Sequence, residues 1–96
     1  MNTFYVYILT NQNHTVFYVG FTDDVYRRTI EHKEKLLKGF TSKYNVNKLV
    51  YFEEHNNSNE ALSRERTIKR YKRDWKINLI NSMNPEWRDL FNDFIF

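Results

Sequence analysis

The sequence predicts one α+β domain over residues 1–96, with a small three-stranded, mainly antiparallel sheet flanked by helices. Three observations support this fold class. A chain of 96 residues is long enough for a single compact core. Short aromatic and β-branched runs alternate with segments of helical apolar spacing. Only two glycines and one proline are present, so regular elements should outweigh long loops.

Three strands are expected. The runs 4–9 and 16–21 are rich in aromatic and β-branched residues, and the polar segment 10–15 between them favours a hairpin. A third run of this kind spans 48–53. With two strands joined by a short loop, the sheet is predicted to be mainly antiparallel.

The hairpin brings two tyrosines together. If its turn is centred near Gln12 and Asn13, Tyr7 lies directly opposite Tyr18, on the face shared by Leu9. Directly opposite residues have Cβ atoms about 5 Å apart. Such a pair is common as ordinary cross-strand packing. It could also orient a water molecule, although a phenol with a pKa near ~10 needs a nearby cation to act as a base.

The first helix is expected from about residue 25 to Leu37, after the capping side chains of residues 22–24 and before Gly39. Its apolar arc consists of Val25, Thr29, Ile30, Leu36 and Leu37. Arg28 and His32 lie one turn apart at the edge of this arc. Arg28 is either a phosphate ligand or one member of a surface ion pair.

Further helices are expected from residue 58 through Arg73 and over part of 74–82. The tail that follows Pro85 is apolar enough to pack on the domain. Its last apolar side chains either close the core or form a dimer contact, and the first alternative is favoured; these are Phe91, Phe94, Ile95 and Phe96. A homodimer is possible, but nothing in the sequence indicates one.

Composition excludes several classes of protein. The chain has no cysteine, so a disulfide scaffold, a cysteine-ligated zinc site and a thiol nucleophile are ruled out. The sequence contains neither an apolar run of membrane-spanning length nor a recognisable signal peptide. We therefore expect a cytoplasmic protein without a membrane partner.

Positive charge is concentrated in two segments. The net charge is only +3, but residues 27–43 carry +4 and residues 64–76 carry +5. Clusters of this kind are typical of proteins that bind a polyanion, usually nucleic acid. Two lysine-rich solvated helix faces would give the same pattern.

Glu65 departs from a purely structural pattern. On a helical wheel it falls between Ala61 and Ile68, inside the arc that should be buried. A buried carboxylate is costly unless it is paired or bound to metal. A neighbouring arginine or lysine could neutralise it, or it could serve as a metal ligand or general base.

These residues, in this order, resemble a known family. Residues 5–7, residues 18–20, Arg28 with His32, and Glu65 are similar to the successive motifs of the GIY-YIG nuclease domain. Tyr5 stands at the position of the name-giving glycine. Segments 61–69 and 84–90 resemble the small, standalone members that are described as predicted endonucleases, so the likeness covers nearly the whole chain.

The resemblance implies a site and a reaction. Glu65 would bind Mg²⁺ or Mn²⁺, and a phenol would orient and deprotonate the attacking water. Arg28 would stabilise charge on the phosphate, and His32 would support a phosphate oxygen or relay a proton. The implied catalytic residues are Tyr7, Tyr18, Arg28, His32, Glu65 and Asn84, with Asn81 as the alternative to Asn84.

The expected function is therefore a metal-dependent endonuclease in DNA repair, recombination or processing, with DNA favoured over RNA and no small-molecule cofactor. The alternative is a non-catalytic nucleic-acid-binding module on the same fold. A further alternative is a protein-interaction domain. The residues expected to contact nucleic acid are Gly20, Arg27, Lys43, Lys69, Arg70, Lys72 and Arg73.

Overall fold

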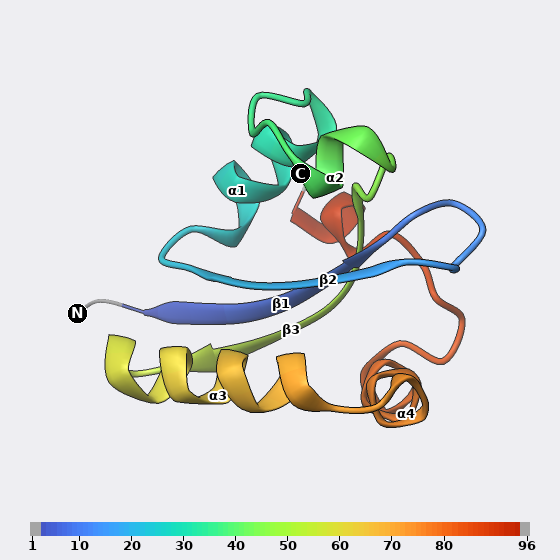
Figure 1. Ribbon diagram of the computed structural model, residues 1–96. Helices are drawn as coiled ribbons and strands as arrows, with labels where there is room; N and C mark the ends of the chain where they lie inside the picture. The colour runs from blue at the N-terminus through green and yellow to red at the C-terminus, as the bar shows by residue number, and fades with distance from the viewer. Residues whose placement is uncertain (1–2, 95–96) are drawn as a thin grey trace.

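A three-stranded sheet lies between two layers of helices in the computed structural model, which describes residues 3–94 (Figure 1). The elements in chain order are β1 (Phe4–Thr10), β2 (Phe17–Thr22), α1 (Val25–Lys33), α2 (Phe40–Lys43), β3 (Lys48–His55), α3 (Ser58–Arg70), α4 (Arg73–Met83) and the 3₁₀ helix η1 (Leu90–Phe94). The strand order is β2-β1-β3, and both pairings are antiparallel. The predicted α+β class is confirmed.

Each face of the sheet has its own apolar cluster because successive strand residues point to opposite sides. Helices α3 and α4 cover one face, where Val6, Ile8 and Ile68 are fully buried. The other face carries Leu9, together with Tyr7, beneath α1, α2 and η1. Figure 1 shows the central sheet between these two layers.

The register of the hairpin differs from the prediction. Tyr7 pairs with Gly20, and Tyr18 pairs with Leu9. The turn is displaced because the Asn11 side chain accepts hydrogen bonds from two backbone N–H groups later in the loop, at 2.8 and 3.2 Å. The displacement shifts the pairing by two residues, and a two-residue shift keeps every side chain on its face. The two tyrosines are therefore diagonal neighbours rather than directly opposite.

Helix α1 ends four residues before the predicted boundary. Lys35 adopts a left-handed conformation (φ 56°), and the N–H of Leu36 donates to the carbonyl of Glu31 at 2.9 Å. This is a Schellman end, which glycine usually forms. Leu36 consequently lies outside the helix and is 63% exposed, so its place in the predicted buried arc is wrong.

The predicted second helix is also too long. Helix α3 ends at Arg70, and extended backbone at Tyr71 and Lys72 separates it from α4. The tail packs as the core-closing alternative predicts, since Phe91 and Phe94 lie against the apolar cluster on the α1 face. Residues 95 and 96 lie outside the described residues. Among residues 3–94, no helix has the length and apolarity needed to cross a membrane.

Candidate active site

Tyr7 and His32 form the centre of a buried polar cluster between the sheet and α1. Tyr7 is 1% exposed and His32 is 3% exposed. The Tyr7 hydroxyl lies 3.2 Å from His32 Nε2, and His32 Nδ1 lies 3.0 Å from Thr41 Oγ1 on α2. Both ring nitrogens of His32 therefore have partners, which fixes the orientation of the ring.

Tyr18 completes an aromatic triangle. Its ring centroid lies 6.3 Å from that of Tyr7 and 5.4 Å from that of His32. Tyr18 is half-buried, whereas Tyr7 is enclosed. Of the two phenols, Tyr18 is thus the more accessible to a bound substrate.

Gly20 makes room for this arrangement. A Cβ at Gly20 would lie 2.5 Å from the Tyr7 hydroxyl and 2.6 Å from Tyr7 Cζ. The residue itself is buried. The Tyr7 ring occupies the space beside Gly20, and the register of β1 with β2 passes the glycine without a bulge. Its contact with nucleic acid stays a prediction.

Burial shifts the pKa values of Tyr7 and His32 in the directions that favour their neutral forms. It raises the pKa of the Tyr7 phenol, as does Tyr18, while the Arg28 guanidinium opposes the rise. Burial also lowers the pKa of His32 to about 4, with a further lowering by Arg28 and an opposing effect of Glu31. At neutral pH, Tyr7 keeps its proton and His32 is uncharged.

A neutral His32 can donate one hydrogen bond and accept one. In one tautomer the Tyr7 hydroxyl donates to Nε2, and Nδ1–H donates to Thr41. In the other, Thr41 donates to Nδ1 and Nε2–H donates to the Tyr7 oxygen, which leaves the Tyr7 O–H free of His32. The chain of three groups can therefore reverse its hydrogen bonds without changing its net charge.

Arg28 supplies positive charge next to this cluster. Its side chain is one-third exposed, and Nε lies 3.0 Å from Glu31 Oε1. This contact lacks hydrogen-bond geometry, and Nε is a buried N–H without a hydrogen-bond partner among the described residues. An unsatisfied buried donor is costly, so Arg28 and Glu31 form an ion pair that is incompletely hydrogen-bonded.

Glu65 on α3 is mostly covered, with its side chain 13% exposed. Lys69 Nζ lies 3.5 Å from Glu65 Oε1, one helical turn away. The charge of Glu65 also contributes to the raised pKa of Tyr7, so the two groups interact electrostatically. Residues 3–94 contain no group of three or more His, Asp or Glu side chains that could hold a metal.

Asn84 and Asn81 hold the tail in place. The Asn84 amide donates to the carbonyls of Val50 and Arg88 at 3.2 and 2.8 Å, and its oxygen accepts from the Arg88 N–H. Asn81 accepts from Trp87 Nε1 at 2.6 Å. None of these hydrogen bonds reaches the tyrosine cluster, so the structure gives both amides a supporting role in the fold.

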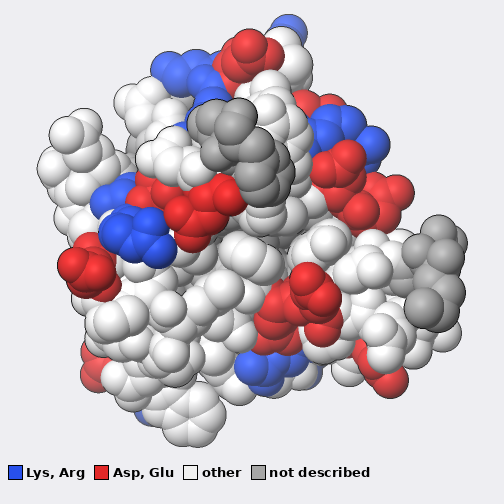
Figure 2. Space-filling view, turned by 180° about the vertical axis from the view of Figure 1, so that it is seen from behind, with Lys and Arg blue, Asp and Glu red and all other residues white. Residues whose placement is uncertain are grey.

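The six basic residues that are predicted to contact nucleic acid fall into two groups. Four already have partners in the protein: Arg27 pairs with Asp23, Lys69 pairs with Glu65, Arg73 donates to the hairpin carbonyls of His14 and Thr15, and Lys43 lies over the Tyr44 ring. Arg70 and Lys72 are exposed and make no ion pair with any described residue. On the face shown in Figure 2, basic side chains lie beside acidic ones rather than in one continuous patch.

Sequence reasoning missed two residues of the site. Thr41 holds His32 from α2, and Glu31 lies against Arg28. The i,i+3 spacing of Arg28 and Glu31 could have revealed the second contact. Nothing local marks Thr41, because it reaches His32 only through the fold of the segment after α1.

Residues 3–78 match the GIY-YIG catalytic domain. The chain belongs to the GIY-YIG family. Among its relatives is a UPF0213 protein of Clostridium perfringens, 38% identical over 78 residues that cover 81% of this chain and 83% of the relative. Another, from Haloquadratum walsbyi, is 39% identical over 75 residues, with 78% and 83% covered.

A solved structure has the same fold. It is the solution NMR structure of a UPF0213 protein from Bacillus halodurans, with a TM-score of 0.57 and 26% identity, covering 91% of this chain and 92% of that one. Membership in the GIY-YIG family implies nuclease-type activity on nucleic acid. The polar cluster around Tyr7 lies within the matched residues.

Proposed function

We propose that this GIY-YIG protein is a divalent-metal-dependent endonuclease that hydrolyses phosphodiester bonds, with DNA as its substrate, in DNA repair, recombination or processing. One observation carries the proposal. The buried Tyr7 and His32 and the half-buried Tyr18 form a single cluster beside Arg28, whose Nε lacks a hydrogen-bond partner among the described residues. A phosphate anion fits this combination of phenol donors and unsatisfied guanidinium.

Glu65 fits a metal ligand. Its carboxylate is mostly covered, and its paired cation, Lys69, is 3.5 Å away. Mg²⁺ commonly binds through one or two carboxylates, with water and substrate phosphate completing its shell. A Mg²⁺ or Mn²⁺ ion bound there would polarise a phosphoryl oxygen and stabilise the leaving 3′-oxygen.

The protein side chains have separate tasks in this reaction. Arg28 holds the scissile phosphate and stabilises the charge that develops on it. Tyr7 keeps its proton because burial raises its pKa, so it acts as a hydrogen-bond donor positioned by His32. The more accessible Tyr18 orients the attacking water. The water oxygen bonds to phosphorus as the bond to the 3′-oxygen breaks; the water gives up its proton to solvent, and the 3′-oxygen takes up a proton from solvent.

The test is a cleavage assay on supercoiled plasmid, branched DNA and RNA with Mg²⁺, Mn²⁺ or EDTA. Glu65→Gln keeps the shape of the side chain but removes its charge, and we expect cleavage to fall about 10³-fold, as expected when several kcal/mol of transition-state stabilisation are lost. EDTA should abolish cleavage by the unmodified protein.

Glu60→Gln is the matched control because Glu60 is exposed in the first turn of the same helix. It should cut at the normal rate. Cleavage by Glu65→Gln at the normal rate, or no cleavage of any substrate by the unmodified protein, would refute the proposal. Salt-sensitive binding without cleavage would instead support the non-catalytic binding module.

A further inference from the structure

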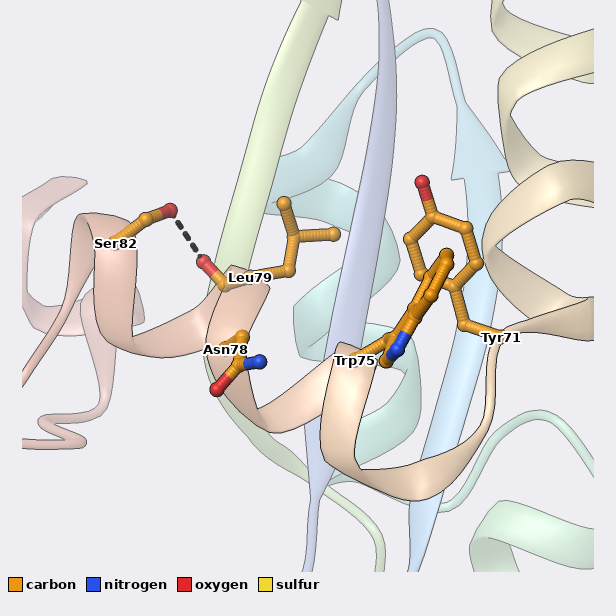
Figure 3. A pocket seen from close by; sticks show the side chains of 5 residues that line it. All are labelled: Tyr71, Trp75, Asn78, Leu79 and Ser82. Atoms are coloured by element: carbon orange, nitrogen blue, oxygen red, sulfur yellow. Dashed lines mark hydrogen bonds between the residues drawn. The ribbon is translucent and has the colours of Figure 1, made fainter.

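An aromatic hollow lies where α3 passes into α4, outside the tyrosine cluster. It has a volume of about 340 Å³ and is lined by Tyr71, Trp75, Asn78, Leu79 and Ser82 (Figure 3). Trp75 is 60% exposed. The protein's other tryptophan, Trp87, packs against the core. A large ring left in water needs an explanation, because its burial would be favourable.

The exposed ring has a rigid support. Tyr71 and Trp75 are in edge contact, with ring centroids 5.2 Å apart and an interplanar angle of 71°. The Tyr71 hydroxyl accepts a hydrogen bond from Arg64 Nη1 at 3.2 Å, and its ring packs against the core. The Trp75 ring therefore packs against a tyrosine ring whose position is held by the core and by Arg64, and Figure 3 shows the two rings next to each other.

Positive charge adjoins the hollow. A second depression of about 250 Å³ shares Tyr71 and Trp75 and is completed by Arg70 and Lys72. Both basic side chains are exposed and make no ion pair with any described residue. Free cations beside an exposed indole are complementary to the phosphate and base of one nucleotide.

We propose that this surface is a binding site for single-stranded DNA, with an unpaired base stacked on Trp75 and its phosphates held by Arg70 and Lys72. The inference rests on the proposed nuclease function and narrows its substrate to DNA with an unpaired segment beside the cut. Base faces in a duplex are covered by their neighbours, so an exposed ring selects unpaired bases. Asn78 offers an amide for the edge of the stacked base.

The site lies close enough to serve the same strand as Glu65. Tyr71 lies six positions after Glu65, directly after the last residue of α3, which corresponds to about 9 Å along the helix axis. That distance spans about three nucleotides at duplex spacing. A strand held at Trp75 therefore continues within reach of the proposed metal ligand.

Binding can be measured without cleavage. The sequence contains two tryptophans, so Trp87→Phe leaves Trp75 as the only indole. Its fluorescence should be quenched when a short oligothymidine is titrated in EDTA and should change less with a blunt duplex of equal length. Unchanged fluorescence at oligothymidine concentrations that saturate binding in an anisotropy assay would overturn the proposal.

Affinity for a labelled oligothymidine gives the second readout. Trp75→Ala should weaken binding about 5- to 100-fold, the range expected for one stacked base, and Trp75→Phe should retain most of the affinity. Met83→Ala, an exposed apolar truncation on the same helix, should have no effect. Lys72→Ala should reduce the slope of log K against log salt by about 0.7.

Three results for Trp75→Ala would refute the single-strand site. The first is normal affinity for oligothymidine, and the second is equal weakening of binding to single strand and duplex. The third is that the unmodified protein forms a dimer without DNA and that this substitution dissociates the dimer. Thermal unfolding of Trp75→Ala should match that of the unmodified protein, so that lost binding is not lost folding. Because these measurements are made in EDTA, they stand whether or not the chain cleaves DNA. If the protein cleaves no DNA but still binds oligothymidine through Trp75, the proposed nuclease function is refuted and the proposed binding site stands.

Discussion

Two polar clusters on opposite faces of the sheet are built from the same residue types. The cluster beneath α1 combines Tyr7, Tyr18 and His32 with Arg28. The cluster beneath α3 combines Tyr51, Glu53 and His55 on β3 with Arg64 and Tyr71. They differ in where the carboxylate lies and in how fully the polar atoms are hydrogen-bonded.

In the α3 cluster, Glu53 is central and its carboxylate is saturated. It accepts a hydrogen bond from the Tyr51 hydroxyl at 2.5 Å and a bifurcated one from the single N–H of Arg64 Nε, at 2.9 and 3.2 Å from its two oxygens. His55 Nε2 lies 2.6 Å from it. Burial alone would raise the pKa of Glu53, but the hydrogen bonds from Tyr51, Arg64 and His55 outweigh burial and lower it. Each charge has its partner, so this cluster stabilises the fold.

In the α1 cluster, no carboxylate occupies the centre. Arg28 Nε lies 3.0 Å from Glu31 Oε1 but lacks a hydrogen bond among the described residues. Glu65, whose charge acts on Tyr7 from α3, has only a 3.5 Å pairing to Lys69. Residue type therefore does not distinguish a structural network from a candidate active site. The distinction lies in incomplete hydrogen bonding, which leaves room for a ligand.

Substitution of Arg28 and Arg64 by alanine, one at a time, should separate the catalytic role from the structural role most clearly. Arg28→Ala should lower the cleavage rate about 10²- to 10³-fold, the loss typical of one transition-state donor, and change stability by less than about 0.5 kcal/mol. Arg64→Ala should leave the cleavage rate of the folded protein at saturating DNA intact and lower stability by about 1–2 kcal/mol, because Glu53 loses its cation. Rates and urea unfolding of both variants measure this. Similar effects from both would break the comparison.

The contributions of the two clusters to the free energy of unfolding should be lost in different pH ranges. The folded-state pKa of His32 is about 4, below the ordinary 6.5, so the unfolded chain gains a proton first as pH falls. The contribution of His32, roughly 3–4 kcal/mol, is present above pH 6.5 and is lost between 6.5 and 4. That of Glu53, whose pKa is lowered from 4.5, is present above 4.5 and is lost only below it.

Urea unfolding between pH 3 and pH 8 tests this separation. His32→Gln should flatten the dependence between pH 6.5 and 4, and Glu53→Gln should flatten it below about 4.5. If stability is constant between pH 6.5 and 4 in the unmodified protein, His32 is not held neutral by the fold.

Gly20→Ala tests whether the packing of Tyr7 against the β2 backbone is needed for stability and cleavage. The new methyl group would meet the Tyr7 hydroxyl and Cζ at 2.5 and 2.6 Å, so a buried ring must move. We expect a loss of about 1–3 kcal/mol from overpacking and reduced cleavage. Gly39→Ala is the control, since its methyl meets no atom within 4 Å and only its φ of 122° is strained. It should cost about 1–2 kcal/mol with normal cleavage. Normal stability and cleavage in Gly20→Ala would contradict the packing described for Tyr7.

The sequence predicted the fold class, the three strands and the face on which Tyr7 and Tyr18 lie. It could not predict the hairpin register, because Asn11 sets the turn through its side-chain hydrogen bonds. It also misplaced the end of α1, where a lysine adopts the conformation that usually marks glycine. Alternation and helical spacing average over several residues, whereas these two boundaries each depend on one side chain or one dihedral angle.

The sequence by itself determined the α+β pattern, the two basic segments and the resemblance that singled out Tyr7, Arg28 and Glu65. Only the tertiary structure decided that His32 is enclosed between Tyr7 and Thr41, and that Asn84 caps the end of α4. The physical reason is that periodicity reports which side of its own element a residue occupies. Burial, hydrogen-bond partners and pKa depend on what the other elements bring to that side.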